Sequence, residues 1–233
     1  MSGEVRRDGG AWGGPIDGLG IVHEDARVIV VDKPSGLLSQ PGRTVSDSVV
    51  ERVRAARPEA RGPMMMHRLD MDTSGLLVLA KDVDAHRHLS GQFERREIGK
   101  TYRARLVAPA PALGGRIELP LRLDVERRPL QIVCTELGRT SVTLWRRLPG
   151  GDPRDVLFHP LTGRTHQLRV HAADPRGLGV PIVGDRLYGE AGPRLMLHAA
   201  RLAFVHPETG RRQICTAKVS FDDGTGILGA SPA

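Results

Sequence analysis

Aromatic residues are scarce in this chain of 233 residues, where two Trp, two Tyr and four Phe make up 3% of the total. Proteins that read single-stranded nucleic acids on an open sheet stack the bases on several aromatic rings. With so few rings available, the composition argues against an RRM-type or OB-type binding surface.

Cysteine pairs and long apolar runs are also missing. Cys134 and Cys215 are isolated thiols without a CxxC spacing, which argues against a zinc ribbon and fits a reducing compartment. No apolar run approaches the length that spans a membrane, and the N-terminus has no apolar signal-peptide core. We therefore expect a cytoplasmic protein with no membrane segment.

Lysine is rare, because Arg supplies 30 of the 34 basic residues. The formal net charge is +7 and the sequence pI is about 10.2, an excess of cations that favours polyanionic partners. The abundance of Arg, Ala, Gly and Pro is equally typical of a GC-rich genome, so the charge alone is weak evidence for nucleic acid. With 39% hydrophobic and 26% charged residues, the composition is that of a globular protein of one or two domains.

Strand-like segments outnumber helix-like segments and come in runs rather than in strict alternation with helices. This order is typical of α+β proteins, in which a mostly antiparallel sheet carries a few flanking helices. The predicted helices begin near Ser46, Asp82 and Thr165, whose side chains can each cap a helix N-terminus. The predicted strands lie at 28–32, 76–80, 100–107, 116–123, within 131–147, and at 156–161, 195–205 and 212–219.

The segment 66–81 combines charged residues, a small polar turn and an apolar run. Thr73 to Gly75 are predicted to form a tight turn, and the apolar residues 76–80 a buried strand. A buried strand is rigid, so the loop before it should hold Asp70 in a fixed place beside Arg68. A fixed carboxylate next to a cation suits covalent or acid–base chemistry.

Other interpretations of this segment compete with an active-site loop. A surface turn in which Asp and Ser only cap the chain is the commonest meaning of such a motif. A calcium loop would use Asp70, Asp72 and Ser74, but its twelfth position requires Glu and here is Lys81. The calcium interpretation is therefore rejected, and the choice between the other two depends on the rest of the chain.

Six segments, all in the same order, resemble the RluA-type pseudouridine synthase family and in particular its RluA branch, which acts on ribosomal and transfer RNA. The match extends from about residue 21 to 219. The resembling segments are VVDKPSG at 30–36, HRLDMDTSG at 67–75, KTY at 100–102, TGRTHQLRVH at 162–171, GDRLYG at 184–189 and LHA at 197–199.

The resemblance implies the pseudouridine synthase fold, a mixed and mostly antiparallel sheet with flanking helices and a central cleft. It places the catalytic domain at residues 21–222, between a flexible N-terminal tail at 1–20 and a flexible C-terminal tail at 223–233. It also leads us to expect a monomer that modifies a uridine in a stem-loop of transfer RNA, large-subunit ribosomal RNA or both.

Isomerising uridine requires the base to leave C1′ through N1, turn, and rejoin through C5. The resemblance implies that Asp70 is the catalytic aspartate, which either attacks C1′ or takes a proton from C2′. Burial would raise the pKa of such a carboxyl, so a nearby cation is needed, and Arg169 resembles the family arginine that pairs with this aspartate. Tyr102 resembles the residue that stacks on the target base and can take the C5 proton.

The remaining implied site residues contact the substrate. Arg68 resembles the arginine that enters the RNA helix when the uridine is flipped out, a movement needed because stacked bases cannot reach a protein pocket. Leu168 resembles a wall of the pocket. Substrate contacts are further implied for His67, Arg164 and His166. With no phosphate-binding glycine motif and no metal-ligand cluster, we expect neither a cofactor nor a metal.

Two other functions fit parts of the pattern. A non-catalytic RNA-binding or RNA-folding protein on the same fold would have no use for Asp70, Tyr102 and Arg169 together. A glycosylase would release free uracil, and glycoside hydrolysis usually needs a second carboxylate in the same pocket. The nature of the product therefore separates these alternatives.

Overall fold

The computed structural model describes residues 14–219 and 221, and its central feature is a single mixed sheet. The strand order is β1-β2-β3-β9-β4-β8-β7-β5-β6, with β10 paired to β9. Every pair of strands is antiparallel except β3 with β9. The strands are β1 (Gly20–Glu24), β2 (Val28–Lys33), β3 (Ser74–Ala80), β4 (Gly99–Arg105), β5 (Gly114–Leu123), β6 (Gln131–Val133), β7 (Arg139–Arg147), β8 (Asp155–Pro160), β9 (Leu197–Val205) and β10 (Arg212–Thr216). The predicted α+β class is confirmed.

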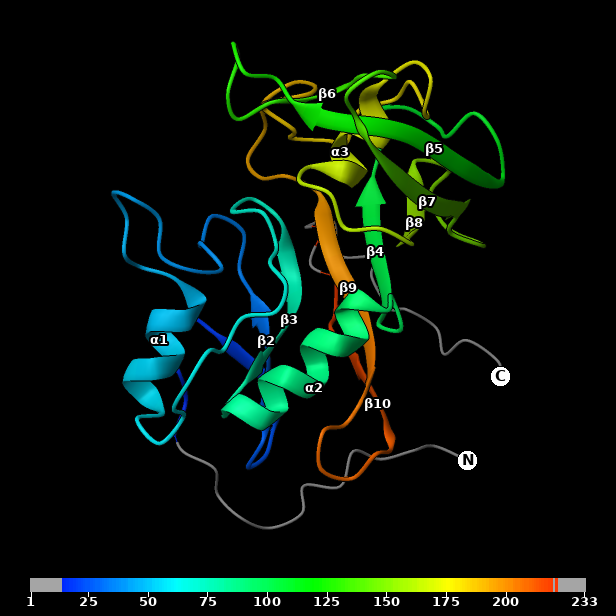
Figure 1. The fold of residues 1–233 in the computed structure, drawn as a ribbon. Helices are drawn as coiled ribbons and strands as arrows, with labels where there is room; N and C mark the ends of the chain where they lie inside the picture. Colours follow the sequence, from blue (N-terminus) through cyan, green and yellow to red (C-terminus); the bar gives the residue numbers. More distant parts are fainter. Residues whose placement is uncertain (1–13, 220, 222–233) are drawn as a thin grey trace.

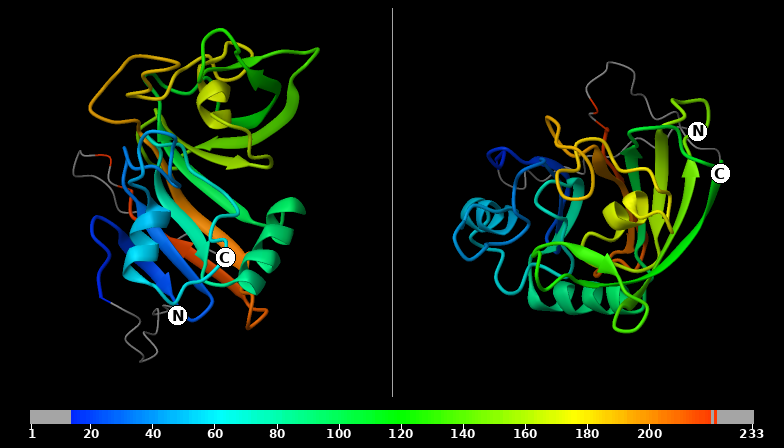
Figure 2. Two further views of the ribbon diagram at one scale, coloured as in Figure 1. Left: turned by 60° about the vertical axis from the view of Figure 1, so that its left-hand side comes forward. Right: turned by 90° about the horizontal axis from the view of Figure 1, so that it is seen from above.

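In the described part of the chain, three helices cover this sheet in two lobes (Figure 1). Helices α1 (Val49–Ala56) and α2 (Val83–Glu94) lie in the lobe that holds β1, β2, β3 and β10. Helix α3 (Gln167–Ala173) packs on β5, β6 and β7 in the other lobe. The further views in Figure 2 show the same division, with β4 and β9 running from one lobe into the other. The two lobes are thus parts of one continuous sheet.

Strand β2 shows why the first lobe is stable. Its side chains alternate between two faces, as the pleat of a strand requires. Ile29 and Val31 pack into the core under α1, and Val28 and Val30 pack into the core under α2. Because both faces are covered by helices, β2 is an uninterrupted apolar run, which makes it a rigid support for the loops at its end.

The helix caps test the predicted helix starts. Asp82 is confirmed as the cap of α2, because its Oδ1 accepts the backbone N–H groups of Asp84 and Ala85 at 2.9 Å. The prediction of Ser46 for α1 is wrong. The hydroxyl of Ser48 accepts the N–H of Glu51 at 3.3 Å, and Ser48 is fully buried where it bridges to Leu38. Tertiary packing therefore moves the start of the helix two residues along the chain.

The predicted turn at Thr73 to Gly75 is also displaced. The turn comes earlier, where the N–H of Thr73 donates to the carbonyl of Asp70 at 3.1 Å, and Ser74 already begins β3. Gly75 lies at φ +109°, and a Cβ there would stand 2.5 Å from the backbone N and O of Ala199 in β9. The glycine is needed for the close approach of β3 to β9.

The predicted domain limits, 21 and 222, lie near the two ends of the described residues. Most of the predicted tail at 1–20 and all of that at 223–233 lie outside the described residues. Ile16 and Leu19 are 4% and 7% exposed and pack into the core under α1, so the packed chain begins before the predicted limit of 21. None of the helices in the described part of the chain is long and apolar enough to cross a membrane.

Candidate active site

A cavity of about 940 Å³ lies where the loop before β3, strand β4 and the segment leading into α3 come together. All of the site residues expected from the sequence line it. They are Asp70, Tyr102 and Arg169, together with His67, Arg68, Arg164, His166 and Leu168. Segments about 100 residues apart in the chain thus converge on one hollow, as the predicted central cleft requires.

The loop that carries Asp70 is held in place from below by a buried lysine. Lys33, at the end of β2, is fully buried, and its Nζ donates to the carbonyls of Pro34, Leu37 and Met71 at 2.9, 2.6 and 2.9 Å. Burial lowers the pKa of Lys33 to about 8, although the charges of Asp70 and Asp72 act in the opposite direction. A cation therefore lies close under the candidate catalytic carboxylate.

Two serines hold the same loop by its backbone. The hydroxyl of Ser39 donates to the carbonyl of Leu69 at 2.8 Å and accepts the N–H of Leu69 at 3.0 Å. The hydroxyl of Ser35 donates to the carbonyl of Asp72 at 2.7 Å. The loop is thus fixed on both sides of Asp70, and this positions the carboxylate before any substrate arrives.

The Asp70 carboxylate itself makes no hydrogen bond or ion pair within the described ranges 14–219 and 221. It is half-buried, and its charge acts on its neighbours. Burial and the Asp70 charge raise the pKa of Tyr102 well above its usual range, so the phenol is neutral at physiological pH. The carboxylate oxygens are therefore free to meet a substrate beside a neutral, partly buried aromatic ring.

Arg169 lies in α3 and binds a different carboxylate from the one expected. Its Nε and Nη2 donate to Asp185 at 2.8 and 2.5 Å, and the two side chains are 2% and 1% exposed. Among the residues that the structure describes, the predicted direct ion pair with Asp70 does not form. Burial lowers the pKa of Arg169, but the bonds to Asp185 and the charges of Asp185 and Asp70 raise it overall. The interaction between Asp70 and the Arg169 guanidinium is thus electrostatic and acts through space.

Tyr188 links Arg169 to His166 in the wall of the cavity. Its ring lies 5.3 Å from the Arg169 guanidinium carbon, and its hydroxyl accepts the N–H of Gln131 at 2.7 Å. The same hydroxyl is 2.8 Å from Nδ1 of His166. His166 is held at φ +52°, a left-handed conformation, and burial lowers its pKa. A connected polar network therefore runs from Asp185 to the cavity wall.

The start of α3 departs from the prediction. The expected cap, Thr165, does not fill that place; His166 does, and its side chain makes no capping bond. The ring of His166 is instead turned to Tyr188, which explains the left-handed backbone at a residue with a bulky side chain.

His67 supports strand β3 and packs on helix α2. Its ring stacks on Phe93 with centroids 4.5 Å apart, and its Nε2 accepts the N–H of Val78 at 3.2 Å. The parallel ladder of β3 with β9 covers only Ser74 and Gly75, so Val78 needs an acceptor from elsewhere. Burial and the charge of Lys100 lower the pKa of His67 to about 3. The ring is therefore a neutral part of the cavity wall.

The other residues expected to contact the substrate differ in exposure and in the bonds that they make to the protein. Arg68 is exposed and makes no hydrogen bond or ion pair with any described residue. Arg164 is half-buried, and its Nε donates weakly to the carbonyl of Thr140 at 3.4 Å. Leu168 is 7% exposed and belongs to the core under α3. These positions suit a mobile cation, an anchored cation and an apolar wall, respectively.

Sequence reasoning did not assign the partners of these residues. Asp185 and Tyr188 belong to the GDRLYG segment, and Lys33 belongs to the VVDKPSG segment. Neither period nor spacing links them to Arg169 or Asp70. The sequence offered one indication of these partners: Asp185, Tyr188 and Lys33 are polar residues within segments that resemble the family.

The cavity brings a fixed carboxylate, a phenol and several cations together, a set that suits an enzyme acting on an anionic substrate. A sequence model described as RNA pseudouridylate synthase matches residues 27–174, and the chain belongs to that family. It is an RNA pseudouridine synthase, an isomerase, as the resemblance predicted.

Individual relatives are similar over most of their length. The dual-specificity RNA pseudouridine synthase RluA of Escherichia coli strain K12 is 42% identical over 213 residues, which are 87% of this chain and 94% of that one. RluA of Vibrio parahaemolyticus is 44% identical over 202 residues, or 81% and 78% of the two chains. The solved structure of human RNA Pseudouridylate Synthase Domain Containing 1 superposes with a TM-score of 0.71 at 30% identity, covering 88% and 85%.

Proposed function

We propose that this enzyme converts a uridine in a stem-loop of transfer RNA, large-subunit ribosomal RNA or both into pseudouridine, as a cytoplasmic monomer. The dual specificity in the names of its bacterial relatives supports a choice of more than one RNA. The net charge of +7 supports binding of a polyanion. The free thiols Cys134 and Cys215 suit a reducing compartment.

The observation that carries the proposed mechanism is the Asp70 carboxylate, fixed by its loop inside the cavity and without a bonding partner among residues 14–219 and 221. In the proposed reaction the bond from C1′ to N1 breaks, with Asp70 either attacking C1′ or taking the proton from C2′. The base then turns and C5 bonds to C1′. On the first route this bond displaces Asp70 from C1′, and on the second Asp70 returns the proton to C2′. C5 then loses its proton while N1 gains one. No water is consumed, so the atoms of substrate and product are the same.

Tyr102 is proposed to stack on the target base and to serve in removing the C5 proton. Its ring is packed against the cores of both lobes, which fixes the plane on which a base can stack. Because burial and Asp70 raise the pKa of Tyr102, the phenol must give up its own proton before it can take one.

Arg68 is proposed to enter the RNA helix in place of the flipped uridine. Its exposure and its lack of any partner among the described side chains leave it free to move. Arg169 is proposed to stabilise the charge of Asp70 through space, with Asp185 fixing its position. Leu168, His67, Arg164 and His166 are proposed to complete the wall around the nucleotide.

We propose that neither metal nor cofactor takes part. The nearest approach to a metal site in residues 14–219 is a group formed by His23, Asp25 and His206. Both imidazole Nε2 atoms lie 2.8 Å from the same Asp25 oxygen, and Nδ1 of His206 accepts the N–H groups of Glu208 and Thr209. A ring that accepts at Nδ1 carries its proton on Nε2, so His206 donates to Asp25 instead of binding a metal.

Release of tritium from RNA labelled at uridine C5 tests the function. The wild-type enzyme is expected to release tritium and no free uracil, whereas Asp70→Asn is expected to release neither. Asp72→Asn is a matched control, since Asp72 is two residues away and pairs with Arg186 at 3.2 Å at the surface. Free uracil would indicate a glycosylase, and wild-type turnover in Asp70→Asn would refute the role of Asp70. Mapping pseudouridines in a strain without the gene identifies the RNA.

A further inference from the structure

Helix α2 ends in a Schellman motif whose left-handed position is filled by an arginine. The N–H of Arg96 donates to the carbonyl of Phe93 at 3.1 Å, and the N–H of Glu97 donates to that of Gln92 at 2.9 Å. Arg96 lies at φ +60°. Glycine normally takes this place because it has no Cβ to clash. A side chain that is kept at an unfavourable backbone position calls for an explanation.

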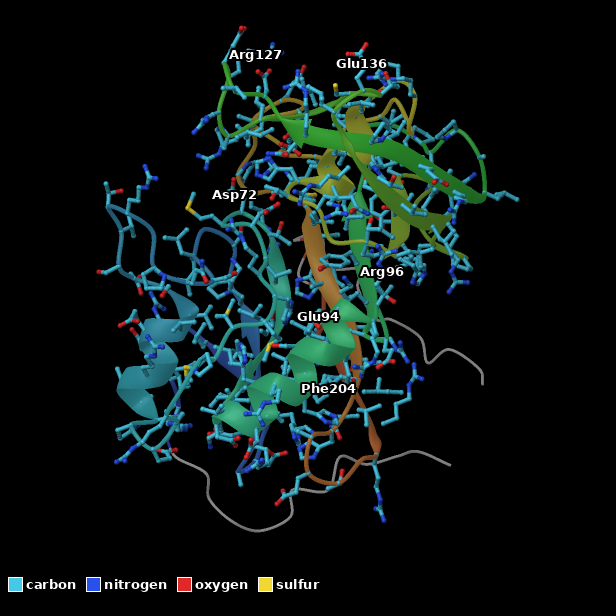
Figure 3. The ribbon with its side chains drawn as sticks, viewed as in Figure 1. Asp72, Glu94, Arg96, Arg127, Glu136 and Phe204 are labelled. Atoms are coloured by element: carbon cyan, nitrogen blue, oxygen red, sulfur yellow. The ribbon has the colours of Figure 1, made fainter. Side chains whose placement is uncertain are left out.

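The side chain of Arg96 stands at the edge of the active-site cavity. It is exposed, it lines the cavity, and its guanidinium makes no hydrogen bond or ion pair with any described residue. Its neighbour Arg95 differs, because that guanidinium is bound by Glu97 at 2.8 and 3.0 Å. Figure 3 shows Arg96 at the C-terminal end of α2, the end that is nearer to the lobe containing α3.

The cavity around Arg96 is electropositive. Its acidic lining residues are Asp70 and Glu97, and Arg95 already neutralises the second. The basic lining residues are more numerous, even without Arg169, which Asp185 neutralises: Arg68, Arg96, Lys100, Arg164 and Arg201. The surplus of positive charge therefore faces any molecule that enters the cavity. Arg96 contributes one of these charges, from the C-terminal end of α2.

We propose that Arg96 binds a backbone phosphate of the RNA strand beside the flipped nucleotide. This proposal rests on the function proposed above. The planar guanidinium donates two parallel hydrogen bonds to a phosphate, a geometry that lysine cannot match. Arg96 lines the cavity and is exposed, so this fork is accessible to a strand that enters the cavity. Arg96 is thus a binding residue that positions the strand while Asp70 acts on the nucleoside.

Glycine at this position separates strain from function. Arg96→Gly is expected to fold at least as well as the wild type, with a melting temperature that is unchanged or higher by about 2–4 °C. Its Kd for the substrate RNA is expected to rise about tenfold, because a charge-assisted contact is lost. The slope of log Kd against log salt should fall by about 0.7–0.9, the value for one phosphate.

Two further variants complete the test. Arg212→Gln removes one charge from an exposed residue of β10 that does not line the cavity, and it should leave Kd within about twofold of wild type. Arg96→Lys keeps the charge and should recover part of the affinity. If Arg96→Gly binds RNA no more weakly than Arg212→Gln, the proposal is overturned. If the wild type binds RNA but releases no tritium, the proposed function fails while the phosphate contact can still be measured.

Discussion

The buried ion pair of Arg169 and Asp185 acts on the Asp70 carboxylate by its charge, without a hydrogen bond or ion pair to Asp70 among the described residues. A guanidinium bound in a fork keeps a fixed orientation, so its charge acts on Asp70 from a constant place. This arrangement leaves both Asp70 oxygens for the substrate. A direct ion pair would have to break before Asp70 could attack C1′ or take a proton from C2′.

Removing Asp185 should leave a charge uncompensated in the core. Asp185→Ala is expected to lower the free energy of unfolding by about 3–5 kcal/mol, the usual cost of breaking a buried pair from one side. Asp174→Ala, which breaks the pair with the exposed Arg176, should cost about 1 kcal/mol or less. Urea unfolding of both variants measures the difference. Equal losses would mean that burial does not make the Arg169–Asp185 pair more costly to break.

Tyr102 combines a stacking surface and a hydroxyl, and two substitutions separate them. Tyr102→Phe keeps the ring and is expected to bind RNA within about twofold of the wild type, whereas Tyr102→Ala should bind about tenfold more weakly. Fluorescence anisotropy with labelled RNA gives both affinities. Weak binding by Tyr102→Phe would show that the neutral hydroxyl, and not the ring, makes the main contact.

At the scale of secondary structure, the parallel pair of β3 and β9 joins the Asp70 loop to the strand that carries Tyr102. Strand β9 pairs with β3 through Ser74 and Gly75 and with β4 through residues that include Tyr102. Ala199 of β9 thus pairs with Gly75 on one side and with Tyr102 on the other, which brings the Asp70 loop and the phenol together. The short length of the β3–β9 pair also leaves room for His67 at the diverging edge of β3.

Gly75→Ala should disrupt this pair. The new Cβ would meet the backbone of Ala199 at 2.5 Å, and φ of +109° is unfavourable for alanine, so we expect a loss of about 3 kcal/mol or more in unfolding free energy. Gly36→Ala is the control, because Gly36 lies at φ +88° with nothing within 4 Å of an added Cβ. Its loss should come from strain alone, at about 1 kcal/mol. Similar losses at the two positions would mean that the close approach is unimportant.

Elements of regular period were predictable, and elements set by distant contacts were not. The apolar period identified α2, and the capping residue Asp82 fixed its start. Ser48 and His166 begin the other helices for reasons that lie elsewhere in the molecule: a bridge to Leu38 in the first case and the Tyr188 hydroxyl in the second. Local sequence records neither contact.

At the scale of the whole molecule, the candidate site was located by motif, but the contacts that support it depend on the fold. The resemblance named residues that all line one cavity. It did not reveal that Lys33 supports the Asp70 loop or that Asp185 holds Arg169. Those bonds join segments that are far apart in the chain and meet only in the folded sheet, so the sequence alone does not predict them.

Buried histidines in both lobes should make the stability of the whole protein depend on pH. Burial lowers the pKa of His67 to about 3 and that of His171 and His198 to about 4, and it lowers the pKa of His159 and His166 as well. In the unfolded chain these rings titrate near their ordinary pKa of about 6.5. At a pH between the folded and the unfolded pKa values, these histidines bind protons in the unfolded state but not in the folded state, so acid favours unfolding.

The stabilisation should therefore be complete above about pH 6.5 and be lost as the pH falls toward 4. Each such histidine removes up to about 1.4 kcal/mol of unfolding free energy per pH unit in this window. Urea unfolding between pH 7.5 and 5 measures the slope, which near pH 5 should correspond to at least three extra protons in the unfolded state. A free energy of unfolding that stays constant over this range would contradict the burial of these rings. His198→Gln should reduce the slope by one proton, because it removes one of the titrating groups from both states.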